Sequence, residues 1–274
     1  MTAIAVALAL GLVGAAALGS LTTLSRPPIG VIRENYAGRW IPVVLGLAMV
    51  AAAVPSAIIG ARVGDRVAAL GLRGDILVAA VVGLWVVGAL DDAFGGPVRG
   101  IRAHMASLLR GRPTTGLLKM AAGVAAAVVL GLALGGDPVR VGASVVLIAV
   151  ATNVWNALDV VPGRALRWGI VALVPLLALG WQGDYGLVAA GMLGAALGVL
   201  PFDLAERGML GDAGSNPLGL VVGAGLAGFL PTPWVVVAAV VGLALQLAAE
   251  TITISRLIDA VPPLRWFDRL GRRS

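Results

Sequence analysis

The chain consists of long apolar runs separated by short polar segments. The hydrocarbon core of a bilayer is about 30 Å thick, so a helix that crosses it needs around 20 mostly apolar residues. By this measure the pattern predicts about nine membrane-spanning helices, and the shorter runs leave a range of eight to ten. The predicted spans cover residues 2–24, 41–60, 76–90, 117–134, 141–157, 168–180, 185–200, 218–230 and 233–254.

Composition supports the same interpretation. Of the 274 residues, 59% are apolar and only 12% are charged, and the mean hydropathy is +0.98. A soluble domain is about half apolar and about a quarter charged, so the surplus of apolar side chains must face lipid. We therefore expect an all-α, polytopic membrane bundle formed as one domain by residues 1–254. The chain has no cysteine, which excludes disulfides and thiolate metal sites.

The positive charges predict how the bundle is oriented. Sixteen of the 20 Lys and Arg residues belong to alternate polar segments, with Lys119 counted beside its loop. Those segments are 25–40, 91–116, 158–167, 201–217 and 255–274. Because cytoplasmic loops carry the excess of Lys and Arg, we expect these five segments and the C-terminus in the cytoplasm, and the N-terminus outside. Basic residues so placed indicate membrane orientation rather than nucleic-acid binding.

The last 20 residues, 255–274, mix apolar side chains with five arginines. Their apolar members are Leu257, Ile258, Leu264, Trp266, Phe267 and Leu270. Such a mixture predicts a basic amphipathic tail that lies along the inner membrane surface. A disordered basic tail is the alternative interpretation.

Three polar clusters stand at the predicted cytoplasmic ends of the spans. The first is the pair Asp91–Asp92, directly after the span 76–90. Adjacent carboxylates repel each other unless a cation or water screens them, and Mg²⁺ is typically held by one or two carboxylates together with phosphates and water. The pair therefore predicts a divalent metal site, and a solvated helix end is the alternative.

The second cluster consists of Asn153, Asn156 and Asp159 at the end of the span 141–157. Their spacing of three residues brings the side chains close together on one helical face. That arrangement suits recognition of a substrate's amide and hydroxyl groups, with Asp159 as a metal ligand. Hydrogen bonding between helices inside the bundle is an equally reasonable interpretation.

The third cluster is the segment 211–217, Gly-Asp-Ala-Gly-Ser-Asn-Pro, which precedes the span 218–230. A glycine-rich backbone beside a helix start offers N–H groups to a phosphate, and Asp212 adds a carboxylate. A simple turn has the same composition. All three clusters fall on the same predicted membrane face, so a bundle could gather them into one metal–phosphate site.

At these residues the sequence resembles the polyprenyl-phosphate N-acetylhexosamine-1-phosphate transferase superfamily, glycosyltransferase family 4, which includes phospho-N-acetylmuramoyl-pentapeptide transferase. Asp91 and Asp92 match the family's aspartate pair, and Asn153, Asn156 and Asp159 match its Asn-x-x-Asn-x-x-Asp stretch. Residues 210–215 match its Met-Gly-Asp-x-Gly-Ser loop. Residues 35–42 and Lys119 also look similar to family positions, so the resemblance runs from about residue 25 to residue 220.

The resemblance implies an enzyme that transfers a sugar-1-phosphate from a UDP-sugar to a polyprenyl (undecaprenyl) phosphate and releases UMP. It implies Mg²⁺ as the cofactor, with Mn²⁺ as an option, and a role in cell-envelope glycan synthesis at the bacterial cytoplasmic membrane, with the active site facing the cytoplasm. The implied partners are the polyprenyl phosphate, the UDP-sugar and the membrane. A homodimer is left open.

The resemblance also implies roles for individual residues. Asp91, Asp92 and Asp212 would be catalytic, and Asp92, Asp159 and Asp212 would hold the metal. The substrate-binding residues would be Asn153, Asn156, Asp159, Lys119, Gly211, Gly214 and Ser215. Arg99 and Arg164 are further candidates for phosphate oxygens, although contacts with lipid headgroups are the more usual role of loop arginines.

The chain departs from the family at the last cytoplasmic loop, which is rich in histidine in the family. Its only histidine is His104, in an earlier loop and without an assigned role. A catalytically degenerate relative that binds lipid carriers or acts as a scaffold is therefore the alternative function.

Overall fold

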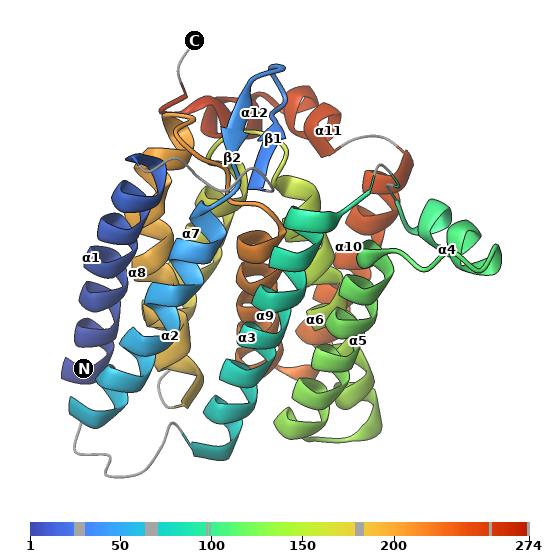
Figure 1. Cartoon of the computed structure of the whole chain (residues 1–274). Coiled ribbons are helices and arrows are strands. Elements are labelled where there is room, and N and C mark those ends of the chain that lie inside the picture. The colour runs from blue at the N-terminus through green and yellow to red at the C-terminus, as the bar shows by residue number, and fades with distance from the viewer. Residues whose placement is uncertain are drawn as a thin grey trace.

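The computed structural model describes residues 1–24, 31–63, 71–96, 98, 100–178, 184–251 and 254–272, and this part of the chain is almost entirely helical (Figure 1). The longer helices are α1 (Thr2–Leu24), α2 (Leu45–Val63), α3 (Gly71–Phe94), α5 (Thr115–Leu134), α6 (Pro138–Leu158), α7 (Arg164–Ala178), α8 (Asp184–Leu204), α9 (Asp212–Phe229) and α10 (Thr232–Thr251). The shorter elements are β1 (Ile32–Glu34), β2 (Trp40–Pro42), α4 (Ile101–Leu109), α11 (Ile254–Ala260) and α12 (Pro262–Arg269).

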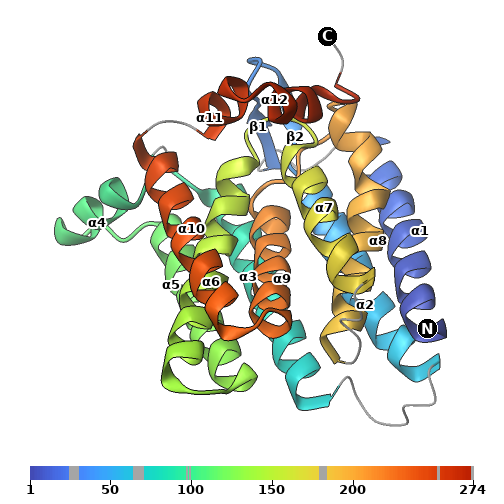
Figure 2. The same ribbon diagram turned by 180° about the vertical axis from the view of Figure 1, so that it is seen from behind.

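Each predicted span overlaps one of the longer helices, although the helix ends differ by several residues, and the predicted fold class is confirmed. Among the described residues, seven helices are long and apolar enough to cross a membrane: α1, α2, α3, α5, α6, α8 and α10. Of the other two, α9 lies inside the bundle, whereas α7 runs along its face and exposes side chains such as Val171 and Val174 (Figure 2). Helix α9 packs against α2, α3, α5, α6, α7 and α8, and nearly all of its first 14 residues are buried.

The two chain ends lie at opposite ends of the bundle, as an odd number of crossings requires (Figure 1). The hairpin, the start of α9, and α11 and α12 gather at the end that carries the C-terminus (Figure 1). The carboxyl ends of α3 and α6 lie there too (Figure 1). We call this the polar end. It brings together the segments that the charge pattern places on one side.

A small β-hairpin at the polar end was not predicted. Strands β1 and β2 pair antiparallel, with Ile32 opposite Pro42 and Glu34 opposite Trp40. The Asn35 side chain accepts hydrogen bonds from the backbone N–H groups of Ala37 and Arg39, which stabilises the turn. The hairpin is fixed to the segment before α9, because the Met209 N–H donates to the Pro42 carbonyl over 2.8 Å.

The tail forms two helices, α11 and α12, that lie across the polar end (Figure 2). The side chains of Arg164 and Asp268 are both only 3% exposed, and they form two parallel hydrogen bonds of 2.8 Å. Although burial opposes it, the hydrogen bonds and charges of Arg164 and Arg272 lower the pKa of the Asp268 carboxyl. Arg164 is therefore a structural partner of the tail, and its candidate role as a phosphate ligand is not supported.

This ion pair predicts a stability difference between two aspartates of the tail. Replacing Asp268 by asparagine should lower the free energy of unfolding by about 3–5 kcal/mol, because it leaves Arg164 buried without a full counter-charge. Asp259→Asn is the matched control: its side chain is 54% exposed and pairs with Arg269 only at 3.8 Å, so its effect should stay within about 0.5 kcal/mol. Thermal unfolding of both variants in detergent tests this, and equal shifts in Tm would contradict it.

Candidate active site

The contact between α3 and α9 positions the first and third polar clusters, Asp91–Asp92 and the segment 211–217, against each other. Gly88 of α3 permits this contact, since a Cβ atom there would lie within 3.0 Å of the Asp212 carbonyl. One turn later, the Asp92 carboxylate accepts hydrogen bonds of 2.9 Å from the backbone N–H groups of both Asp212 and Ala213. Asp92 thus caps the start of α9 from another helix, and a negative charge at this position is also favoured by the helix dipole.

Lys119, in the second turn of α5, links the acidic residues of two other helices. Its ammonium group forms ion pairs with Asp91, at 2.9 Å, and with Asp212. Thr115, one turn earlier, donates a hydrogen bond to the other oxygen of Asp91. Asn156 completes the group: with its amide turned so that each end faces a suitable partner, the nitrogen donates to Asp212 over 2.7 Å and the oxygen accepts from Lys119 over 3.1 Å.

Asp91 and Asp92 therefore have different contacts, although they are neighbours in the sequence. Both lie in the last turn of α3 rather than after it, and successive helical residues point about 100° apart. Asp91 faces Lys119 and Asp92 faces the start of α9. The two adjacent carboxylates thus have different hydrogen-bond partners, although the sequence pattern suggested one site formed by the pair.

The cluster at the end of α6 also divides. Asn153 donates a hydrogen bond of 2.5 Å to Gln246 of α10, which is the helix–helix contact considered as an alternative for this cluster. Asn156 faces Asp212 and Lys119, whereas Asp159 follows the last turn of α6 as its C-cap. Asn156 and Asp159 are therefore the two members of this cluster that lie near the Asp212 carboxylate of α9.

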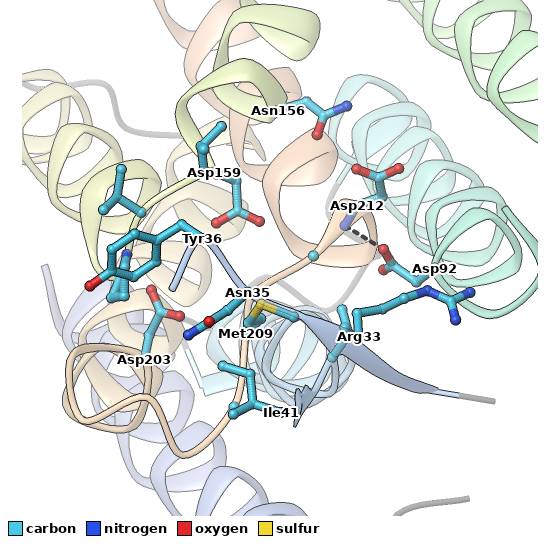
Figure 3. Close-up of a pocket in the computed structure, with 16 residues that line it drawn as sticks. Arg33, Asn35, Tyr36, Ile41, Asp92, Asn156, Asp159, Asp203, Met209 and Asp212 are labelled. Atoms are coloured by element: carbon cyan, nitrogen blue, oxygen red, sulfur yellow. Dashed lines mark hydrogen bonds between the residues drawn. The ribbon is translucent and has the colours of Figure 1, made fainter. Parts of the chain in front are cut away.

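Two cavities open at the polar end, and residues from all three clusters line both. The smaller one, of about 230 Å³, lies beneath the β-hairpin; Asp92, Asp159 and Asp212 stand along it in Figure 3. The larger one, of about 680 Å³, extends toward α4 and α10 and contains Asp91, Lys119 and His104 in its lining. Arg33, Asp92, Asn156, Asp159 and Asp212 border both cavities.

The structure adds two residues that the sequence interpretation did not single out. Asp203, in the last turn of α8, is buried and accepts a hydrogen bond of 2.6 Å from the Gly163 N–H. Arg33 of β1 donates to the carbonyl of Ala93 over 3.0 Å. The signal for Asp203 was available, because an acidic residue at the end of an apolar span tends to mark function. Arg33 could not be predicted from the sequence, because it is the β-hairpin that brings it to the site.

The segment 211–215 is held mainly by its own hydrogen bonds and by its neighbours. Gly211 has a φ of +68°, and a Cβ atom there would lie within 3.0 Å of Val43 and Asp92. The N–H groups of Gly214 and Ser215 both donate to the Gly211 carbonyl. The first N–H groups of α9 are thus already engaged, by Asp92 or within the turn. A role of Gly211, Gly214 and Ser215 in substrate binding stays a prediction.

Several acidic side chains surround Asp159, and their negative charge favours binding of the predicted metal ion. Removal from water, together with repulsion by Asp203, Asp212 and Asp92, raises the pKa of the Asp159 carboxyl well above its ordinary range. Within the described residues no three His, Cys, Asp or Glu side chains stand close enough to hold a metal by themselves. Hard carboxylate oxygens with excess negative charge nevertheless fit Mg²⁺, which takes only one or two protein carboxylates when substrate phosphates complete its shell.

Residues 75–229, more than half of the chain, match the model of the glycosyl transferase family 4. The matched region begins in α3 and ends with α9, so it contains Asp91, Asp92, Lys119, Asn156, Asp159 and Asp212. The chain belongs to this family of membrane transferases, which transfer sugar phosphates to polyprenyl phosphates. No curated protein matches the sequence.

Proposed function

We propose that this protein transfers a sugar-1-phosphate from a UDP-sugar to a polyprenyl phosphate, with undecaprenyl phosphate as the acceptor, and releases UMP. The observation that carries the proposal is the connected group at the polar end, in which Lys119 joins Asp91 to Asp212 and Asp92 fixes the start of α9. This group borders two cavities at one end of a membrane bundle. Such a site suits one substrate from the lipid and one from water.

The reaction is a single displacement at phosphorus. An oxygen of the acceptor phosphate bonds to the phosphorus that carries the sugar, and the bond from this phosphorus to the bridging oxygen breaks. UMP leaves with the electron pair of that bond, and the product is a polyprenyl diphosphate sugar. The acceptor phosphate has a second pKa near 6 and is largely ionised at neutral pH, so it needs no strong general base. Catalysis then consists of positioning and charge neutralisation.

Each residue of the group has a role in that scheme. Lys119 supplies positive charge to the phosphate oxygens, and Asp91, itself held by the Thr115 hydroxyl, keeps its side chain in position. Asn156 orients Asp212 and offers an amide to the substrate. Asp92 keeps the first turn of α9 in place, so that a change at Asp92 acts through Asp212.

Asp212 and Asp159 are the carboxylates that would hold Mg²⁺. When bound, the ion would offset the charge of the diphosphate and of the departing UMP. Asp92, the third residue predicted as a ligand, already accepts two backbone hydrogen bonds. We therefore assign it chiefly to the positioning of Asp212.

We further propose that the polar end faces the cytoplasm of a bacterial cell, where nucleotide sugars are made, and that the product enters cell-envelope glycan synthesis. In the sequence, 16 of the chain's 20 Lys and Arg residues belong to the polar segments predicted on this side, which agrees with the preference of such residues for cytoplasmic loops.

The test is UMP release by the purified protein in lipid nanodiscs, with undecaprenyl phosphate and a panel of UDP-sugars. We expect turnover with at least one donor, dependence on Mg²⁺ and loss of activity on chelation with EDTA. Omission of undecaprenyl phosphate is the control, because simple hydrolysis of the donor would not need it. A lack of turnover with every donor would contradict the proposal and favour a lipid-binding or scaffold role.

A further inference from the structure

The single histidine of the chain lies at the candidate site. His104 belongs to α4, a helix in the segment between α3 and α5, and it lines the larger cavity together with Asp91, Lys119 and Asp212. The local sequence pattern did not place it there, because it lies in a loop segment 15 positions before Lys119.

Two contacts hold the imidazole ring against the start of α5. A Cβ atom at Gly116 would lie within 3.0 Å of the ring atoms Cε1 and Nε2, so the ring rests on backbone that only glycine leaves open. The ring atom Nδ1 lies 2.8 Å from the Thr114 hydroxyl. Thr114 is itself fixed as the N-cap of α5, where its hydroxyl accepts from the Leu117 N–H. The ring is thus tied to the first turn of the helix that carries Lys119.

Most hydrogen-bond donors around the larger cavity already have partners within the protein, so few are free for an incoming phosphate. Lys119 is engaged by Asp91 and Asp212, and Arg33 donates to the Ala93 carbonyl. The Nε2 atom of His104 has no hydrogen-bond partner among the residues that the structure describes. The bond to Thr114 can run in either direction, depending on the tautomer of the ring. When the Thr114 hydroxyl donates to Nδ1, the neutral ring carries its hydrogen on Nε2, and the imidazolium carries one on both nitrogens.

We propose that His104 is a substrate-contact residue, whose Nε2–H group donates a hydrogen bond to a phosphate oxygen of a substrate in the larger cavity. Thr114 and Gly116 orient the ring for this contact. The inference rests on the proposed function, which supplies two sources of such an oxygen: the phosphate of the lipid acceptor and the diphosphate of the nucleotide.

Equilibrium binding of undecaprenyl phosphate and of UDP to the protein in nanodiscs separates these sources. His104→Ala should raise the Kd of one ligand about 10-fold to 100-fold, the effect of losing one hydrogen bond to a charged group, and leave the Kd of the other nearly unchanged. The affected ligand identifies the source. An unchanged Kd for both ligands would overturn the inference.

Two conservative variants distinguish substrate contact from a structural role. Glutamine places its amide nitrogen near the position of Nε2, whereas asparagine places its amide near Nδ1 and Thr114. His104→Gln should therefore retain most of the affinity, and His104→Asn should behave like His104→Ala. The reverse order would show that the bond to Thr114 is what matters, and would overturn the proposal.

Gly116 provides a second, independent check. Gly116→Ala should displace the imidazole and raise the Kd of the same ligand, but it should cause no further loss in the His104→Ala background, where the three nearest atoms of its surroundings are gone. Additive losses would contradict the inference. If the wild-type protein binds neither ligand, both the proposed function and this inference fail. If His104→Ala binds both ligands as tightly as the wild type does, only the inference fails.

Discussion

Asp212→Asn should reduce UMP release by about 1,000-fold or more, the scale seen when charge stabilisation is lost at a phosphoryl-transfer site. The substitution keeps the size of the side chain and its contact with Asn156, but it removes the charge that pairs with Lys119 and would hold Mg²⁺. Steady-state turnover at saturating Mg²⁺ measures the effect.

Asp259→Asn is the matched control for this variant, because it makes the same chemical change on an exposed helix of the polar end. It should retain wild-type turnover. Comparable activity of the Asp212 and Asp259 variants would exclude a role for Asp212 in the reaction.

Lys119→Met should lower turnover by about 100-fold to 1,000-fold, because the substrate phosphates lose their nearest fixed positive charge. It should also destabilise the protein by about 3–5 kcal/mol, since Asp91 and Asp212 are left facing each other without a cation between them. The two effects can be separated by measuring kcat on protein that is shown to be folded at the assay temperature.

Lys119→Arg separates charge from geometry at the same position. It restores the positive charge, but a planar guanidinium does not fit between two carboxylates as a compact ammonium does. We expect stability close to that of the wild type and turnover reduced about tenfold. Full activity of Lys119→Met would show that this lysine only stabilises the fold.

The sequence predicted the helices well, because a continuous apolar run of about 20 residues has few structural solutions other than a membrane helix. Helix ends were less predictable. The hairpin was missed because its strands are only three residues long and are fixed by distant contacts, such as that between Pro42 and Met209. The helix α4 was missed for a similar reason, since nine residues give little periodic signal.

The residues of the site were largely predictable, but their pairings were not. Charge at the ends of apolar spans singled out Asp91, Asp92, Asp159 and Asp212. Which of them faces Lys119 and which caps α9 depends on how α3, α5 and α9 pack. The same packing assigns Asn153 to Gln246 and Arg164 to Asp268, and it brings His104 to the cavity. The contacts of Asn153 and Arg164 span 93 and 104 residues of sequence and leave no local pattern.

The most direct measurement follows UMP and the lipid product in one reaction. With purified protein, undecaprenyl phosphate, a UDP-sugar and Mg²⁺, UMP and polyprenyl diphosphate sugar should form in equal amounts, and Asp212→Asn should form neither. Release of UMP without the lipid-linked product, or normal product formation by the Asp212 variant, would show that the acidic group at the ends of α3, α6 and α9 is not a site of phosphosugar transfer.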